Sequence, residues 1–212
     1  MNRLVNIAAV FVASFILSTM AIGQEVYEEG KHYKRLDTAV RTSNPNKIEL
    51  VEAFSYTCAH CYSFEPLVKS YKKTLADDVN FVRTHVTWNA MNENLARALY
   101  TAKALKVEDE IHEALFKGFH LERKVIRTEK EIQSIFSSLG VDDEKFKKAY
   151  NSFGINSQTK QATAKIRGYK LDSTPQLIVN GEYVISANRD INHQQMLEIA
   201  SYLIEKIRNE KN

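Results

Sequence analysis

The sequence predicts an α/β protein in which one mixed sheet is interrupted by an inserted block of helices. A strand, a helix and a second strand follow one another over residues 47–86, which is the order of a βαβ unit. Helical patterns continue through residues 88–165, and two short strands with a final helix end the chain. Because strands lie at both ends of the chain, we expect them to form one sheet, with residues 88–165 as a helical insertion.

The first strand and helix surround the only two cysteines of the chain. The segment KIELVEAF, residues 47–54, is almost continuously apolar, which is typical of a buried strand. From Cys61 onward, apolar residues recur every three or four positions and predict a helix that runs to about Ala76, with a kink at Pro66. VNFVRTHV, residues 79–86, predicts the second strand, and HYKRL near the start of the mature chain is a short possible strand.

The middle of the chain shows a series of amphipathic helical patterns. Thr128 and Glu131 have the spacing of a capping box, and Gly140 is a typical end for the helix that follows this box. The expected helices lie around residues 95–105, 111–116, 132–139, 143–152 and 157–168.

The last part of the chain returns to a strand pattern. In STPQLIVNGEYVI, Asn180 and Gly181 join two short apolar runs, which predicts a β-hairpin. Residues 191–207 then predict an amphipathic helix. We find no internal repeat and no low-complexity linker in the sequence.

The N-terminal segment differs from the rest in composition. Arg3 is followed by the uncharged run LVNIAAVFVASFILSTMAIG, with small residues at Ala21 and Gly23. A basic N-terminal region, an apolar stretch and small residues before the cleavage site are typical of a secretory signal peptide. We expect residues 1–23 to be removed and the mature protein to be exported and soluble. An uncleaved membrane anchor is the alternative, because the run is nearly long enough to span a bilayer.

The charge pattern argues against a function in nucleic-acid binding. Lys and Arg number 29, Asp and Glu number 26, and the net charge is +3. Both signs are spread along the chain, so the basic footprint that is typical of a nucleic-acid-binding protein is missing. We therefore expect no nucleic acid among the partners.

Cys58 and Cys61 lie in FSYTCAHCYSFEP, between the first strand and the helix. Unpaired backbone N–H groups and the helix dipole at such a junction lower a thiol pKa. His60, as an imidazolium, would lower the pKa of Cys58 further. We expect Cys58 to be accessible and Cys61 to be buried beside Phe64. In an exported chain, this arrangement predicts a redox pair for thiol–disulfide exchange.

Two other uses of the pair remain as alternatives. An inert disulfide would close so short a loop that it would stabilise the fold little. A zinc site would need further ligands, and neither another cysteine nor a suitably spaced histidine pair is present. We therefore expect no metal at this motif.

The chain resembles the DsbA-type periplasmic thiol oxidases, which are thioredoxin-fold proteins with a large inserted helical domain. The resemblance is carried by EAFSYTCAHCYSFEP, GVDDEKFKKAYNSF and TPQLIVNGEYVI, in this order, and it covers the chain from YEEGKHYKRLD onward. It implies that residues 24–87 and 166–212 form the thioredoxin fold and that residues 88–165 form the inserted domain. It implies no metal and no organic cofactor.

The family resemblance also implies a mechanism and partners. A substrate thiolate would attack Cys58 of the Cys58–Cys61 disulfide, and a second substrate thiolate would then release the reduced enzyme. The substrates would be reduced exported polypeptides in the periplasm. A membrane-bound, quinone-linked reoxidase of the DsbB type would restore the disulfide, and we expect the protein to be a monomer.

Several further residues correspond to family positions. Pro175 corresponds to a cis-proline beside the cysteine motif, and the backbone at Thr174 would pair with the substrate chain; a trans proline that opens an edge strand is the alternative. Glu52 corresponds to a buried carboxylate that relays protons for the buried cysteine. Glu65 and Arg83 correspond to a neighbouring charged pair. The alternative for the charged residues is an ordinary solvated or salt-bridged position.

Two departures from the family pattern leave the direction of the reaction open. Ala59 stands where the family often has proline, and Thr174 stands where many oxidases have valine, whereas threonine is typical of isomerases and reductases of the superfamily. A disulfide isomerase or reductase is therefore the alternative function, and a non-redox chaperone or binding module is an alternative of another class. We expect the remaining histidines at the surface, and Trp88 would report the redox state if it lies near the site.

Overall fold

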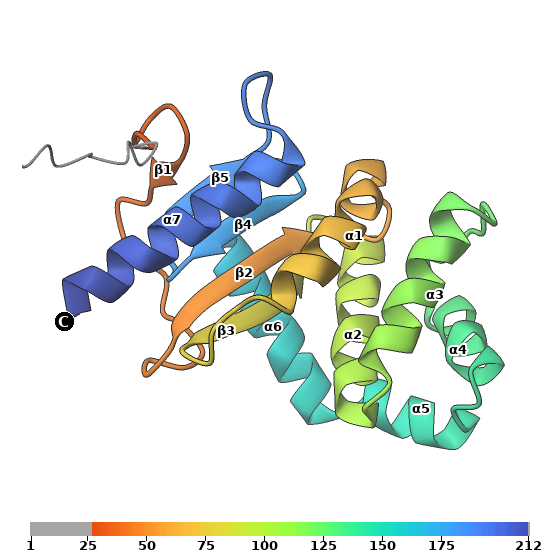
Figure 1. Ribbon diagram of the computed structural model, residues 1–212. Coiled ribbons are helices and arrows are strands. Elements are labelled where there is room, and N and C mark those ends of the chain that lie inside the picture. The colour runs from red at the N-terminus through yellow and green to blue at the C-terminus, as the bar shows by residue number, and fades with distance from the viewer. Residues whose placement is uncertain (1–26, 212) are drawn as a thin grey trace, which may run out of the picture.

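The computed structural model describes residues 27–211, so the predicted signal peptide lies outside the described residues. The elements follow in the expected order of βαβ, helical block and ββα (Figure 1). Their bounds are β1 Lys34–Arg35, β2 Ile48–Phe54, α1 Ala59–Lys72, β3 Val79–His85, α2 Ala90–Leu105, α3 Glu108–His120, α4 Glu129–Ser138, α5 Asp143–Tyr150, α6 Phe153–Gly168, β4 Gln176–Val179, β5 Tyr183–Ser186 and α7 His193–Lys211.

The strands form one mixed sheet in the order β1-β5-β4-β2-β3. β2 and β3 are parallel, and α1 provides the crossover that a parallel pair requires. The other pairings are antiparallel. All seven residues of β2 are buried, because β2 is paired on both sides and covered on both faces. The predicted single sheet is confirmed. The cysteine motif directly follows the C-terminal end of β2.

Alternation along β2 separates two apolar layers. Ile48 and Leu50 belong to the cluster that the sheet forms with α1 and α7 on one face. Val51 and Ala53 belong to the cluster on the opposite face, which includes the end of α6. Figure 1 shows α1 and α7 on the same side of the sheet and α6 on the other. The cysteine-bearing helix is thus fixed to the sheet along its length.

The helices α2 to α5 surround a third apolar cluster beside the sheet. Phe54, Tyr56 and Cys61 contribute to this cluster from the end of β2 and from α1. α6 begins next to the helical block and ends on the sheet, where Ile166 and Tyr169 pack with the strands (Figure 1). Cys61 therefore lies where the sheet, α1 and the helical block meet.

Local sequence signals explain most of the element boundaries. The capping box of Thr128 and Glu131 is present, and Gly140 has the left-handed φ of 81° expected at a helix end. Asn180 and Gly181 have φ values of 52° and 68°, as a tight hairpin turn requires, so the predicted hairpin is confirmed.

Several helix boundaries differ from the prediction by a few residues, and two of them have a clear local cause. α1 ends at Lys72 instead of about Ala76, because the N–H of Lys73 bonds back to Ser70 and Tyr71 and closes the last turn. α6 begins at Phe153, four residues earlier than predicted. Its first turn is stabilised by Ser152, whose Oγ accepts from the N–H of Ile155 across 3.3 Å.

Candidate functional site

Cys58 is the N-cap residue of α1. Its backbone is extended (φ −87°, ψ 116°), and its Sγ accepts a hydrogen bond from the N–H of Cys61 across 3.4 Å. The turn that places it there is closed by a 3.1 Å bond from the N–H of Cys58 to the carbonyl of Ser55, just after β2. A sulfur at this position faces the unpaired N–H groups of the first helical turn, which favour a negative charge.

The two thiols have opposite environments. Both cysteines are free in the structure; Cys58 is partly exposed, whereas Cys61 is fully buried. A hydrogen bond from the Cys61 thiol is the largest influence on Cys58 and, with further bonds from Thr174 and from the backbone of Cys61 and His60, lowers the pKa of Cys58 to about 5 against the effect of burial. Cys58 and burial together raise the pKa of Cys61. The site therefore holds one accessible thiolate beside one protonated thiol.

The surroundings of Cys61 differ in one respect from the prediction. The predicted burial of Cys61 is confirmed. It packs with Phe54 and Tyr56 in the cluster of the helical block, whereas Phe64 belongs to the cluster beneath α7. α1 thus divides its buried side chains between the two cores, and the thiol faces the inserted helices.

His60 is exposed on the first turn of α1, and its ring centre lies 6.4 Å from that of His193 at the start of α7. The His193 ring also contacts the ring of the core residue Phe64, with the ring centres 4.8 Å apart. Burial and the charge of His60 lower the pKa of His193, and Cys58 opposes this effect. His193 is thus a neighbour of the thiolate that the sequence analysis missed, because it is far along the chain and no motif contains it.

The Thr174–Pro175 peptide bond is cis, as the family resemblance implied. The Sγ of Cys58 lies 3.3 Å from the carbonyl oxygen of Thr174 and can donate to it as a thiol. β4 begins at Gln176, directly after this bond, so the N-terminal end of this internal strand is brought against the cysteine motif. The structure therefore brings Cys58, Thr174 and Pro175 together.

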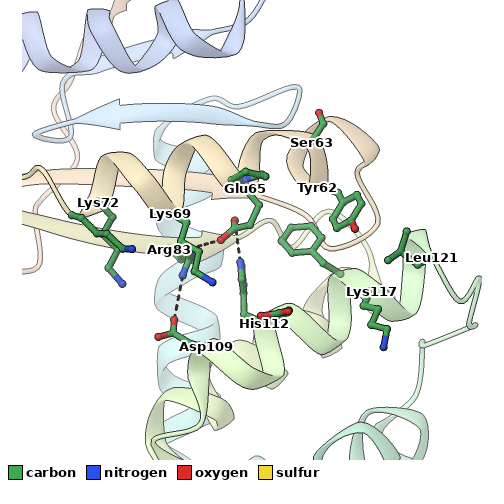
Figure 2. Close-up of a pocket in the computed structure, with 14 residues that line it drawn as sticks. Tyr62, Ser63, Glu65, Lys69, Lys72, Arg83, Asp109, His112, Lys117 and Leu121 are labelled. Atoms are coloured by element: carbon green, nitrogen blue, oxygen red, sulfur yellow. Dashed lines mark hydrogen bonds and ion pairs between the residues drawn. The ribbon is translucent and has the colours of Figure 1, made fainter.

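Glu52 and Arg83, which are buried, and Glu65, which is half-buried, form one charged cluster, so the predicted pairing of Glu65 with Arg83 is confirmed. Arg83 lies next to Glu52 in the parallel register, and its Nε is 3.3 Å from Glu52 Oε2. Its Nη2 is 2.5 Å from Glu65 Oε1 on α1 (Figure 2). Burial, followed by the charge of Glu65, raises the pKa of Glu52 to about 7, and Arg83 opposes both effects. Glu52 can therefore exchange a proton near neutral pH.

Tyr56, two residues before Cys58, is held by three histidines. Its N–H donates to His85 Nε2 across 3.0 Å, and its carbonyl oxygen lies 2.9 Å from His120 Nε2, which donates to it. Its hydroxyl lies 3.1 Å from His112 Nδ1. These contacts fix the backbone and the ring of Tyr56, and with them the turn that leads to Cys58.

The position of two of these histidines corrects the sequence analysis, which placed the remaining histidines at the surface. His85 is 0% exposed and His112 is 4% exposed. Burial lowers the pKa of His85 to about 4, so its ring is neutral, and its Nδ1 donates to the carbonyl oxygen of Val86 across 2.6 Å. His112 Nε2 lies 3.1 Å from Glu65 Oε2 (Figure 2). Apart from Val86, which directly follows His85, the partners of these rings lie on other elements, so local sequence patterns carry no signal for their burial.

Neither a metal centre nor a membrane span appears in the described part of the chain. Residues 27–211 contain no group of three or more His, Cys, Asp or Glu side chains arranged to hold a metal ion. Among the helices formed by these residues, none combines the length and the apolar character that a bilayer crossing requires.

Comparisons with known proteins agree with this arrangement. A family model described as DSBA-like thioredoxin domain matches residues 49–197. The thiol:disulfide interchange protein DsbA of Pseudomonas aeruginosa is 36% identical over 208 residues, 98% of each chain. The protein of that name from Azotobacter vinelandii is 34% identical over 179 residues, 84% of each chain.

Solved structures give the same result. The crystal structure of Pseudomonas aeruginosa DsbA matches with a TM-score of 0.83 at 36% identity, over 87% of this chain and 96% of that chain. The oxidoreductase DsbA from Xylella fastidiosa matches with a TM-score of 0.80 at 25% identity, over 86% and 98% of the two chains. The expected thioredoxin fold with an inserted helical domain is thereby confirmed.

Proposed function

Because the chain belongs to the DSBA-like thioredoxin domain family, we propose that it is a dithiol oxidase that passes a Cys58–Cys61 disulfide to reduced exported polypeptides. The observation that carries this proposal is the asymmetry of the pair. Cys58 is partly exposed and has a pKa lowered to about 5, whereas Cys61 is buried and its pKa is raised. Stabilising the Cys58 thiolate stabilises the reduced form, and the disulfide is then a strong oxidant.

The proposed reaction proceeds in two exchanges. A substrate thiolate attacks Sγ of Cys58, the Cys58–Cys61 bond breaks, and Cys61 leaves as a thiolate that takes up a proton. A second thiolate of the substrate attacks the substrate sulfur of the mixed disulfide, and Cys58 leaves as a thiolate. Two electrons pass from the substrate dithiol to the enzyme. The low pKa of Cys58 makes it a good leaving group in this last step.

Glu52 is proposed to carry the proton that Cys61 gains and loses. Its pKa near 7 allows it to be protonated or ionised under the working conditions. Glu65 and Arg83 would set this pKa, because the charge of Glu65 raises it and the charge of Arg83 lowers it. His60 would stabilise the Cys58 thiolate through its backbone N–H and through its exposed ring on the same turn.

Thr174 and Pro175 are proposed to position the substrate chain. Their cis bond lies against Cys58 at the start of β4, where the backbone of an extended polypeptide could pair beside the reacting sulfur. The substrate cysteine would then be held next to Cys58.

The remaining expectations rest on the N-terminal composition and on the family. We propose that residues 1–23 are a cleaved signal peptide and that the mature protein works as a monomer in the periplasm. A quinone-linked membrane protein of the DsbB type would reoxidise it. Residues 24–87 and 166–212 would form the catalytic domain, and residues 88–165 would form the inserted domain.

Oxidase and isomerase activities are separated by two ribonuclease assays. The proposed oxidase reactivates reduced ribonuclease in the presence of a terminal oxidant and has little effect on scrambled ribonuclease. Reactivation of the scrambled form without added oxidant would instead support the isomerase, for which the Thr174 hydroxyl beside Cys58 is the supporting feature. Cys58→Ser loses either activity, whereas a non-redox chaperone would keep its function in this variant.

A further inference from the structure

A groove of about 770 Å³ lies between α1 and α3, beside the charged cluster, and two members of that cluster, Glu65 and Arg83, contribute to its lining. Its lining changes along its length. Lys69 and Lys72 of α1 and Lys73, the C-cap residue of α1, line one part, and Tyr62, Pro66 and Phe116 line another. Figure 2 shows Lys69, Lys72, Arg83 and Asp109 toward one end and Tyr62, Lys117 and Leu121 toward the other.

The basic end of the α1–α3 groove has more positive charge than its neighbours neutralise. Lys69, Lys72 and Lys73 are exposed, and within the described residues none of them is in ion-pair contact with a carboxylate. The Nζ of Lys72 lies instead 5.8 Å from the ring centre of Phe81. Three cations in just over one helical turn repel one another, so an anion that approaches all three would be stabilised.

Arg83 supplies a fixed cation at the floor of the same end. Its side chain is only 4% exposed and is oriented by the contacts of Nε with Glu52 and of Nη2 with Glu65. Its third nitrogen, Nη1, has a weaker partner: Asp109 Oδ1, at 3.9 Å, from a side chain that is 86% exposed. Asp109 thus occupies the position of an anion at the limit of ion-pair distance, where an incoming carboxylate can replace it.

We propose that the α1–α3 groove binds a small amphipathic anion, namely a carboxylate or sulfonate carried on an aromatic or short alkyl body. The anionic head lies at Arg83 Nη1 between Lys69 and Lys72, and the apolar body covers Pro66 and Phe116. The volume of the groove is in the range of small-molecule sites, and the mixture of apolar walls with a few fixed polar groups is typical of them.

The proposal can be tested by isothermal titration calorimetry with 4-phenylbutyrate as the probe and 4-phenylbutanamide as its uncharged match. We expect saturable one-site binding of the acid and at least about tenfold weaker binding of the amide. Backbone amide NMR shifts should locate the acid at α1 and α3. Equal affinity for the two compounds, or shifts confined to the cysteine motif, would overturn the proposal.

Two substitutions should change the affinity in opposite directions. The double variant Lys69→Glu, Lys72→Glu should weaken binding of the acid by about tenfold or more, because it reverses the charge of the basic end. Asp109→Asn should strengthen binding by about threefold, because it removes the competing carboxylate from Arg83 Nη1. Lys148→Glu, at an exposed lysine of α5 outside the groove, is the matched control and should leave the affinity unchanged.

The outcomes also separate this ligand class from a macromolecular one. All the substituted side chains are exposed, so the variants should keep the thermal unfolding midpoint of the parent protein to within a few degrees. An unchanged affinity in the double variant would overturn the proposal. Tighter binding of a short acidic peptide than of 4-phenylbutyrate, with the same NMR shifts, would also overturn it and would assign the groove to a polypeptide.

Discussion

The N–H of Cys61 donates to the Sγ of Cys58 across 3.4 Å, so the buried cysteine helps to cap the helix with the exposed one. This contact exists because the cysteines are three positions apart at the start of α1, which is the spacing between an N-cap side chain and the N3 amide. The same geometry places the thiolate at the positive end of the helix dipole. Tight coupling between helix capping and thiolate stability follows from it.

The reduced and oxidised forms should differ in how their stability depends on pH. The pKa of Cys58 falls from 9.0 to about 5 in the folded dithiol form. A lowered pKa adds stability that is fully present above the unfolded value and is lost as the pH falls through the folded value. The free energy of unfolding of the reduced form, relative to the oxidised form, should therefore rise between about pH 5 and pH 9. Urea unfolding of both forms at several pH values measures this difference, and a flat profile would contradict it.

The contribution of Glu52 to stability should change with pH in the opposite direction to that of Cys58. Burial raises the pKa of Glu52 from 4.5 to about 7, so its contribution to stability is fully present below pH 4.5 and is lost as the pH rises through 7. The loss should be of the order of 3 kcal/mol for this shift. In Glu52→Gln the decrease over this pH range should disappear, while Glu65 continues to hold Arg83. A variant that keeps the same decrease in urea unfolding experiments would assign it to another group.

Tyr56 should contribute to stability without setting the thiolate pKa. In Tyr56→Phe, the Nδ1 of buried His112 loses its hydroxyl partner, and we expect a loss of about 1 kcal/mol. The backbone contacts with His85 and His120 remain in this variant, so the turn before Cys58 should keep its shape. The Cys58 pKa should therefore stay at about 5. A large change in that pKa would show that the hydroxyl itself acts on the thiol.

Two glycines with positive φ, Gly140 and Gly181, should differ in how much an alanine substitution lowers the stability of the fold. A Cβ on Gly181 would overlap with the carbonyl oxygen of Val40, whereas a Cβ on Gly140 would meet open space. Gly140→Ala should cost about 1 kcal/mol through backbone strain alone. Gly181→Ala should cost more than about 3 kcal/mol, because the hairpin must also move away from Val40. Similar unfolding midpoints for the two variants would contradict this assignment.

Local signals were sufficient to predict the position of the reactive pair. The segment around Cys58 and Cys61 contains a strand pattern, an abrupt change to helical spacing and the two cysteines at that change, all within about 20 to 30 adjacent residues. The turn at Asn180 and Gly181 was likewise predicted from adjacent residues. The cis bond before Pro175 was implied only by the family resemblance. Its approach to Cys58 depends on the pairing of β4 with β2.

The polar network around the pair could not be predicted in this way. Glu49 is fully buried and is held by Lys165, 2.7 Å away on α6, and His112 meets Glu65 and Tyr56 from α3. Each of these contacts joins residues that are far apart in sequence, and a polar side chain is buried only when such a partner is supplied. His193 next to His60 depends in the same way on the packing of α7 against α1.

The assignment of Cys58 as a thiolate at neutral pH, with Cys61 protonated, rests on the opposite pKa shifts of the two thiols. It is tested most directly by the ultraviolet absorbance of the thiolate in the reduced protein as a function of pH, with Cys58→Ser as the control. We expect a single titration with a pKa of about 5 that is lost in Cys58→Ser. A reduced protein whose first thiol titrates near 9, the ordinary value for cysteine, would contradict it.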